Sequence, residues 1–488
     1  MIAGLILFLP FQTVHLFDWD EINFAEAARE MLATGNCFQV TVDYLPFWEK
    51  PPFFIWLQAL SMYLFGVNEF AARFPNVLCG IATLLVIFSI GKKLFDKNFA
   101  ALWVLAFTGS FLPQFYFMSG IIDPVYNLFV FLSVYFAFWF IQSVGGVNKG
   151  NAETFHATSP LVFAGIFLGL AILTKGPAAF LIFALCMLAY GFFANKMQLI
   201  NKLFGSSGSL LNPIIFCLVL LAVCFVYYGV ELIRNGWWFF QNFLDYHIRL
   251  LQTGEAGHGQ PFYYHFLVLL AGCLPAAALI FGSFKKRSND SGVQKDFKLL
   301  MIVMLSVVLI VFSIVKTKII HYSSLCYFPI TFLAAYYMYH IVYKKEKWSG
   351  MVGGLMVILC VLFSTAIGLI PFFMMNKGLW IHFIKDEFAL GNLLADVKWS
   401  YVETLPGITY LLTIFIVIFF IKKIKYRLAF FTLLIGTTIA ANMTIKMIVP
   451  KVERITQGTA ISFYKSCQAL DCYVEVLDFK SYAHLFYT

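Results

Sequence analysis

The stretch NPIIFCLVLLAVCFVYYGV at residues 212–230 contains no Asp, Glu, Lys or Arg. About 20 apolar residues of this kind form a helix that crosses the roughly 30 Å hydrocarbon core of a bilayer. The strands of a membrane β-barrel instead alternate apolar and polar residues. The stretch therefore predicts a transmembrane helix.

The same pattern recurs along the chain, which has 488 residues, 61% of them hydrophobic and only 12% charged. A soluble domain carries about 25% charged residues, so this composition excludes a soluble enzyme and a disordered protein. We predict an all-α polytopic membrane protein with about 13 transmembrane helices. The expected spans are 1–17, 72–90, 99–117, 124–142, 160–174, 177–194, 212–230, 263–284, 299–315, 322–342, 350–373, 407–421 and 428–448.

The distribution of charge orients these spans. Lys and Arg are concentrated in alternate loops from residues 91–98 onward, whereas the remaining loops carry a slight excess of Asp and Glu. By the positive-inside rule the basic loops are cytoplasmic. We therefore expect a cytoplasmic N-terminus. The loops 18–71, 231–262 and 374–406 and the segment 449–488 would then face outward.

Nearly all residues capable of chemistry lie on this outward face, and no phosphate-binding loop or dinucleotide fingerprint is present. We expect no nucleotide cofactor and no nucleic-acid partner. A substrate that is available there and suits so many spans is lipid-linked. Pro52–Phe65 is apolar but lies between charged segments, which favours a helix in the membrane interface.

The first outward loop is the densest candidate site. Asp20 and Glu21 follow the first span, and Glu49 and Lys50 precede two prolines that restrict the backbone. Acids at this position can simply cap a helix, and Glu49 with Lys50 can form a surface ion pair.

Other charges lie at the ends of spans, where they are costly and usually functional. Asp123 begins the fourth span, Lys175 lies in a tight break between two spans, and Lys316 and Lys318 precede Tyr322. A lysine at such a position often only extends its ammonium group toward the headgroups. Several lysines on one face suit a phosphate held just below the headgroups.

These motifs resemble the membrane glycosyltransferases of the C superfamily. The most similar branch contains the aminoarabinose transferases that modify lipid A and the related protein mannosyltransferases. The shared motifs run in order along the chain: Asp20-Glu21, the helix 25–31, Glu49-Lys50-Pro51-Pro52, 65–75, 173–177, the loop 247–265 and Lys316-Thr317-Lys318.

The resemblance implies an inverting transfer of a sugar from a polyprenyl-phosphate carrier to a lipid or protein acceptor outside the cytoplasm. It implies Asp20 as catalytic carboxylate and Asp123 as second carboxylate. It also implies a divalent metal ion held by Glu49 and His247, with His258 as the alternative to His247. The implied contacts to donor and acceptor are Glu21, Lys50, Lys175, Arg249, Lys316, Lys318 and Tyr322.

Asn23 and Phe24 stand where the family commonly has Arg-Tyr, so the identities of the sugar and the acceptor stay open. Residues 1–448 are expected to form the transmembrane domain, and 449–488 the start of a small α/β domain, minimal or incomplete. The alternative function is a transporter or flippase of a lipid-linked or anionic substrate, because buried cations also line such pathways. We find no internal repeat of the kind that transporters show.

Overall fold

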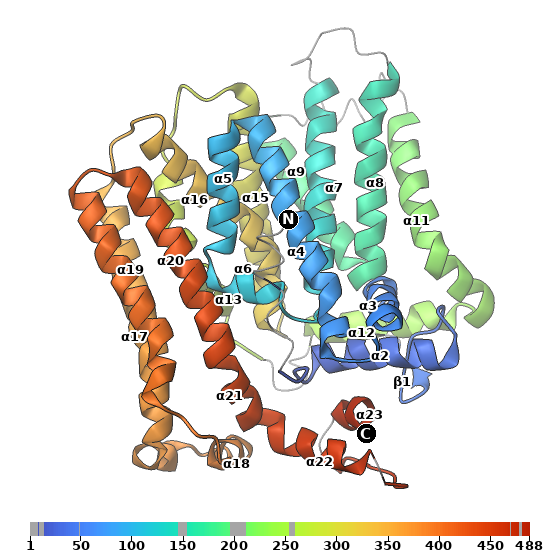
Figure 1. The fold of residues 1–488 in the computed structure, drawn as a ribbon. Helices are drawn as coiled ribbons and strands as arrows, with labels where there is room; N and C mark the ends of the chain where they lie inside the picture. The colour runs from blue at the N-terminus through green and yellow to red at the C-terminus, as the bar shows by residue number, and fades with distance from the viewer. Residues whose placement is uncertain are drawn as a thin grey trace.

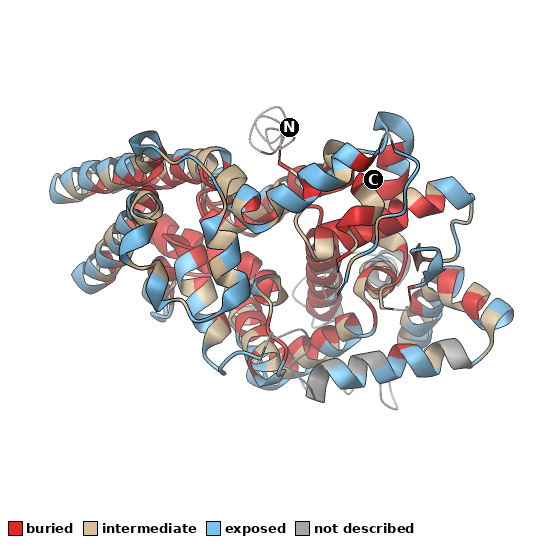
Figure 2. Ribbon diagram, turned by 90° about the horizontal axis from the view of Figure 1, so that it is seen from below, coloured by how far each residue is buried: buried red, intermediate tan, exposed pale blue. Residues whose placement is uncertain are grey.

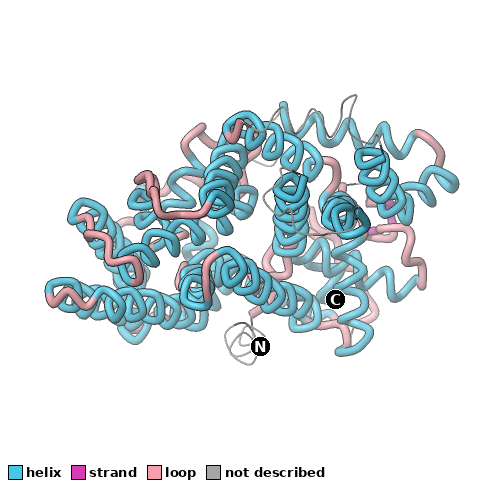
Figure 3. Tube along the Cα trace, turned by 90° about the horizontal axis from the view of Figure 1, so that it is seen from above, coloured by secondary structure: helices cyan, strands magenta, loops and turns pink. Residues whose placement is uncertain are grey.

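The computed structural model describes residues 8, 14–47, 49–144, 154–195, 211–252, 259–468, 470–477 and 481–488. Helices dominate these residues, and only one short two-stranded sheet interrupts them (Figure 3). Among the described residues, eight helices are long and apolar enough to cross a membrane, or nine if one bent pair counts as one span. The prediction of an all-α polytopic membrane protein is thus confirmed, whereas the count of 13 is not.

Upright helices form the body of the molecule (Figure 1). Their bounds are α4 Glu69–Leu94, α5 Lys97–Thr108, α7 Asp123–Val144, α8 Thr154–Lys175, α9 Ala178–Phe193, α11 Leu211–Asn235, α15 Gly292–Ile314, α16 Tyr327–Val342, α17 Gly350–Met375, α19 Leu405–Lys422 and α20 Tyr426–Met447. Buried residues lie along their inner sides and exposed residues at the periphery (Figure 2). Most of the expected span 1–17 lies outside the described residues.

Two expected spans are not single straight helices. The span 99–117 is broken into α5 and α6 (Phe111–Tyr116) at Gly109 and Ser110. A Cβ atom at Gly109 would lie 2.8 Å from the carbonyl oxygen of Leu434 in α20, so this break allows two backbones to approach closely. The span 263–284 is bent by 106° between α13 (Tyr264–Gly272) and the helical residues from Ala276 onward, because Pro275 cannot continue a helical hydrogen-bond ladder.

A second layer of helices crosses the lower ends of the upright helices in Figure 1. It contains α2 (Asp20–Thr34), α3 (Phe53–Phe65) and α12 (Trp238–Gln252). The short α3 matches the interfacial helix expected at 52–65. A hairpin of β1 (Thr41–Val42) and β2 (Leu45–Pro46) is held against α2 by Glu30, whose carboxylate accepts from Thr41 Oγ1 at 2.6 Å and from the amide of Tyr44 at 3.1 Å.

The segment after α20 corrects the expectation of an α/β domain. Its described residues form α21 (Val449–Glu453), a π-helical turn, α22 (Thr459–Cys467) and α23 (Ala483–Tyr487), and they contain no strand. The run 473–477 has strand-forming residues but is exposed and pairs with no other strand, so its preference for extended structure is not realised. This segment packs on α2, and Tyr487 accepts a hydrogen bond from the amide of Leu16 at 2.8 Å.

Candidate active site

Four elements bring ionisable side chains together at one end of the helix bundle. Asp20 begins α2, Asp123 begins α7, Lys175 ends α8, and His321 lies in the 3₁₀ turn η3 (Ile320–Cys326). Lys175 Nζ lies 2.5 Å from Asp123 Oδ1. His321 Nε2 lies 3.1 Å from Asp20 Oδ2 and 3.7 Å from Asp123 Oδ2. We call these four residues the acid–base cluster.

Local sequence places Asp123 and Lys175 at the ends of neighbouring antiparallel helices. Pro124 suits the first turn of α7, where a missing amide hydrogen costs nothing. Gly176 follows Lys175 with φ of +91°, a conformation that favours glycine and ends α8. The carboxylate thus lies at the positive end of one helix dipole and the ammonium group at the negative end of the other, which stabilises both charges.

The loop that carries Asp123 is anchored by buried polar side chains. Asn76 of α4 donates to the carbonyl oxygens of Ser119 at 2.7 Å and Ile121 at 2.6 Å. Gln58 of α3 donates to the carbonyl oxygen of Gly120 at 3.4 Å. Because Gln58 and Asn76 are fully buried, water cannot replace these bonds. The position of Asp123 is therefore set by α3 and α4.

Glu21, an expected substrate contact, makes several hydrogen bonds within the protein. Its Oε1 accepts from Arg73 Nε at 3.0 Å and from the amide of Gly120, and its Oε2 accepts from Arg73 Nη2 at 2.7 Å and from the amide of Phe17 at 2.8 Å. A carboxylate offers about four acceptor positions, and all four are used. Glu21 therefore joins α2, α4 and the loop before Asp123, and this geometry assigns it a positioning role.

The turn that carries His321 is held from two sides. Asn127, one helical turn after Asp123, donates to Ser324 Oγ at 2.7 Å, and Ser324 Oγ donates to the carbonyl oxygen of His321. On the other side, His265 Nδ1 of α13 lies 3.1 Å from Ser323 Oγ. These contacts fix the imidazole relative to Asp123.

The charges of the cluster act strongly on Asp20. Burial raises the pKa of this carboxyl, but the hydrogen bond from His321 and the electrostatic influence of His321, Lys50 and Lys175 outweigh burial and lower the pKa to about 2. Asp20 is therefore an ionised carboxylate at neutral pH. Its dependence on Lys50 places that side chain within electrostatic reach of the cluster.

Lys175 is held in place but keeps donor capacity. Its ammonium group lies 4.8 Å from the ring centroid of Tyr322 and 5.7 Å from that of Tyr126, which are cation–π distances. An ammonium group has three donors, and the bond to Asp123 uses one. Tyr322 is thus a neighbour of Lys175, and its expected contact with substrate stays a prediction.

The side chains of Lys316 and Lys318 lie in different environments. Lys316 is exposed, whereas Lys318 is buried and donates to the carbonyl oxygen of Val315 at 2.6 Å. A direct phosphate contact from either lysine stays a prediction.

Glu49 and Arg249 lie together, but in a second cavity of about 530 Å³ beside the hairpin. Asp43, Asp245 and Tyr482 also line it. The ring of Tyr482 lies 5.3 Å from that of Trp19, the residue before Asp20, so this cavity adjoins the acid–base cluster.

The expected metal site lies partly outside the described residues. His247 lies on α12, but its side chain is outside the described residues, as is His258. Among the described residues no group of three or more His, Cys, Asp or Glu could hold a metal ion. Glu49 shares its cavity with Arg249, whose charge opposes a cation. A metal ligated by Glu49 and His247 stays a prediction.

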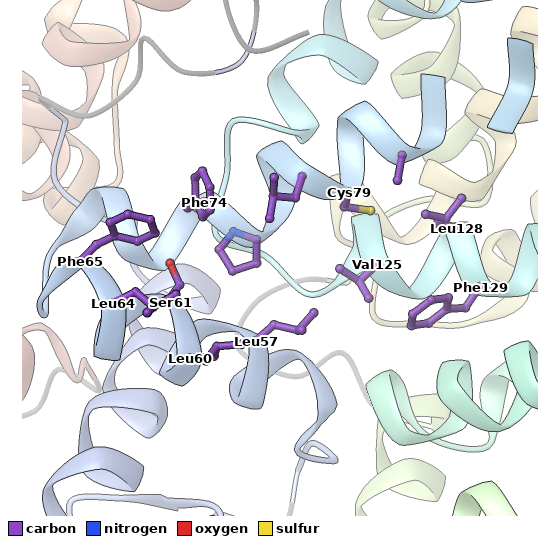
Figure 4. Close-up of a pocket in the computed structure, with 13 residues that line it drawn as sticks. Leu57, Leu60, Ser61, Leu64, Phe65, Phe74, Cys79, Val125, Leu128 and Phe129 are labelled. Carbon is purple, nitrogen blue, oxygen red and sulfur yellow. The ribbon is translucent and has the colours of Figure 1, made fainter. Parts of the chain in front are cut away.

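An apolar groove of about 320 Å³ runs between α3, α4 and α7 (Figure 4). Its walls include Leu57 and Leu64 of α3, Leu78 of α4 and Val125 of α7. Leu64 and Leu78 are exposed, so the groove opens on the outer surface of the helices. Val125 lies two residues after Asp123, on another face of α7. The groove therefore begins within one helical turn of the cluster.

His321 is the cluster member that sequence reasoning did not select. It lies three residues after Lys318, directly beside the Lys316-Thr317-Lys318 motif that was selected. A single histidine near a span end is usually a solvated or buried side chain, and only its contacts to Asp20 and Asp123 distinguish it.

The fold of the whole chain matches that of solved structures. The crystal structure of ArnT from Cupriavidus metallidurans bound to undecaprenyl phosphate superposes with a TM-score of 0.77 and 17% identity, covering 100% of this chain and 83% of that one. The apo crystal structure gives a TM-score of 0.75. The chain therefore has the fold of these ArnT crystal structures, and it is an integral membrane protein.

Sequence comparison gives the same result. The family described as dolichyl-phosphate-mannose-protein mannosyltransferase matches residues 49–227. The undecaprenyl phosphate-α-4-amino-4-deoxy-L-arabinose arabinosyl transferase of Enterobacter sp. is 27% identical over 368 residues, which are 74% of this chain and 63% of that protein. The enzyme of that name from Wigglesworthia glossinidia brevipalpis is 26% identical over 69% of this chain and 57% of its own length.

The chain is thus similar in sequence and in fold to the aminoarabinose transferases, as its motifs predicted. It spans less than two thirds of the length of these curated relatives.

Proposed function

We propose that this protein is an inverting glycosyltransferase that moves a sugar from a polyprenyl-phosphate carrier to a lipid or protein acceptor on the periplasmic side of a bacterial inner membrane. The observation that carries the proposal is the acid–base cluster: two carboxylates, an imidazole and a lysine from four separate elements meet beside an apolar groove. A sugar phosphate on a long hydrocarbon chain needs both environments side by side.

Each part of the cluster matches a requirement of the reaction. The acceptor attacks the anomeric carbon opposite the leaving polyprenyl phosphate, which inverts the configuration. Lys175 and Lys50 neutralise the charge that grows on the phosphate as the carbon–oxygen bond breaks, and fixed cations do this best where little water competes. Phosphate is a good leaving group, so no strong general acid is required. Asp20 contacts His321 and Asp123 contacts Lys175, and the acceptor is proposed to bind beside these groups.

The periplasmic location and the cytoplasmic N-terminus rest on the distribution of Lys and Arg among the loops. The sugar and the acceptor are left open by this proposal, because the chain departs from the family at Asn23 and Phe24 and spans only part of its relatives.

The test is a transfer assay in detergent. The purified protein is incubated with radiolabelled undecaprenyl-phosphate aminoarabinose or undecaprenyl-phosphate mannose and with lipid A or an envelope protein extract. Transfer of the label without any membrane gradient supports the enzyme. Translocation of the donor across a vesicle membrane without any sugar transfer would instead support a flippase.

Replacing Lys175 by Met is expected to weaken donor binding. The substitution keeps the length of the side chain but removes the charge that faces the phosphate. We expect the KM for the donor to rise by about tenfold or more, since a hydrogen bond to a charged group contributes about 1.5–3 kcal/mol, whereas the KM for the acceptor stays within about twofold. Lys385→Met, at an exposed lysine, is the control. An unchanged donor KM would remove Lys175 from the phosphate site.

Filling the apolar groove is expected to discriminate between donors by chain length. Ala82 lines the groove, and Ala82→Trp would place an indole where the hydrocarbon chain is proposed to lie. We expect the KM for an undecaprenyl donor to rise, while a donor with a short water-soluble prenyl chain is used as before. Leu181→Trp, on the exposed surface of α9, is the matched control. Equal effects on both donors would place the chain elsewhere.

A further inference from the structure

One group of the acid–base cluster has no role in the proposed transfer so far, the imidazole of His321. Both carboxylates contact the same ring nitrogen, because Nε2 lies 3.1 Å from Asp20 Oδ2 and 3.7 Å from Asp123 Oδ2. The side chain is 16% exposed, so the ring is neither sealed in the core nor free in solvent.

These contacts determine which nitrogen carries the hydrogen. An ionised carboxylate can only accept a hydrogen bond, and Asp20 is ionised at neutral pH. Nε2 must therefore be protonated. In a neutral imidazole the other nitrogen, Nδ1, then has a free lone pair. Within the part of the chain that the structure describes, Nδ1 makes no hydrogen bond.

We propose that Nδ1 of His321 is the general base of the transfer and that the acceptor presents a hydroxyl group to it. This inference rests on the proposed function and specifies the acceptor class for the same site. A hydroxyl needs a base because it must lose a proton as it attacks, whereas a phosphate acceptor is already anionic.

The step balances in atoms and charge. The acceptor oxygen forms a bond to the anomeric carbon, and its proton moves to Nδ1. The bond between the anomeric carbon and the phosphate oxygen breaks, and its electron pair leaves with the polyprenyl phosphate. Asp20 and Asp123 stabilise the imidazolium, and water then takes up the extra proton. This is the arrangement by which a carboxylate orients a catalytic histidine in hydrolytic triads.

The electrostatic surroundings of His321 come from several elements. Asp20 of α2 and Asp123 of α7 favour the protonated ring. Lys175, at the end of α8, and Lys318, just before η3, oppose it. His265 of α13 interacts with both Lys318 and His321. A general base must have its Nδ1 lone pair free. We therefore expect the rate of transfer to a hydroxyl group to fall on the acid side of the pH profile.

The test compares two nucleophiles that differ only in their need for a base. The full-length protein and His321→Gln are incubated with undecaprenyl-phosphate aminoarabinose or mannose, either in buffer alone, where water accepts the sugar, or with sodium azide. We expect His321→Gln to hydrolyse the donor about 10²–10⁴-fold more slowly, with an unchanged donor KM, and azide to restore turnover as a glycosyl azide. The acid limb of the pH profile should be absent from the azide reaction. His382→Gln, at an exposed histidine, is the control.

The outcomes separate this inference from the proposed function. Three results would show that His321 is not the general base. The first is hydrolysis by His321→Gln at the wild-type rate, and the second is loss of azide turnover together with hydrolysis. The third is transfer to the phosphates of lipid A by the wild type that survives in His321→Gln. A wild-type protein that consumes neither donor with water, azide or any acceptor would refute the transferase itself.

Discussion

Asp20→Asn is expected to lower the rate of sugar transfer by roughly 10³- to 10⁴-fold while the protein still inserts and folds. The amide has the size of the carboxylate but carries no charge, and it can donate a hydrogen to His321 Nε2, which would favour the wrong tautomer. The corresponding change in a serine-protease triad has an effect of this size. The measurement is the rate of label transfer by the purified variant.

Folding of this variant should be unaffected because the Asp20 side chain is 25% exposed and not part of a packed core. Gel filtration in detergent checks this, and Asp396→Asn, at an exposed acid, serves as the control for a lost charge. Turnover of Asp20→Asn within about tenfold of the wild type would show that the carboxylate does not take part in the chemistry.

Glu21→Gln is expected to destabilise the protein by about 3–5 kcal/mol, because removal of one partner leaves the buried charge of Arg73 uncompensated. Arg73 is 3% exposed, and it also donates to the carbonyl oxygens of Val14 and His15, which carry no charge. The loop before Asp123 also loses its anchor to Glu21. The thermal unfolding temperature in detergent measures the effect, and activity should fall together with it.

Replacing both partners tests this interpretation. Glu21→Leu combined with Arg73→Met removes both charges, and we expect it to be more stable than either single variant. Asp396→Gln, at an exposed acid, is the control, and it should cost less than about 1 kcal/mol. If Glu21→Gln unfolds at the wild-type temperature but loses affinity for the donor or the acceptor, Glu21 contacts substrate, as the resemblance implied.

Much of the site could be predicted because charges at the ends of apolar spans are costly and therefore conspicuous. Asp20, Asp123, Lys50 and Lys175 were selected on this ground and by their resemblance to a family. Their convergence was not predictable from spacing alone, since 155 residues separate Asp20 from Lys175 along the sequence.

The features that the sequence did not predict share a physical reason: each depends on a partner distant in sequence. The resemblance implied Glu21 as a substrate contact, and its hydrogen bonds to Arg73 and Gly120 could not be read from the sequence. Residues 473–477 have strand propensity but find no partner strand. Gly109 breaks a continuous apolar run because α20 approaches it closely. His321 became a candidate only when two distant carboxylates were found on its ring.

The most direct measurement is a structure of the protein in lipid nanodiscs with undecaprenyl phosphate. We expect the phosphate group to contact Lys175, next to His321 and Asp123, and the hydrocarbon chain to lie in the groove of α3, α4 and α7. A phosphate group bound at the opposite end of the helix bundle, with the acid–base cluster left empty, would contradict it.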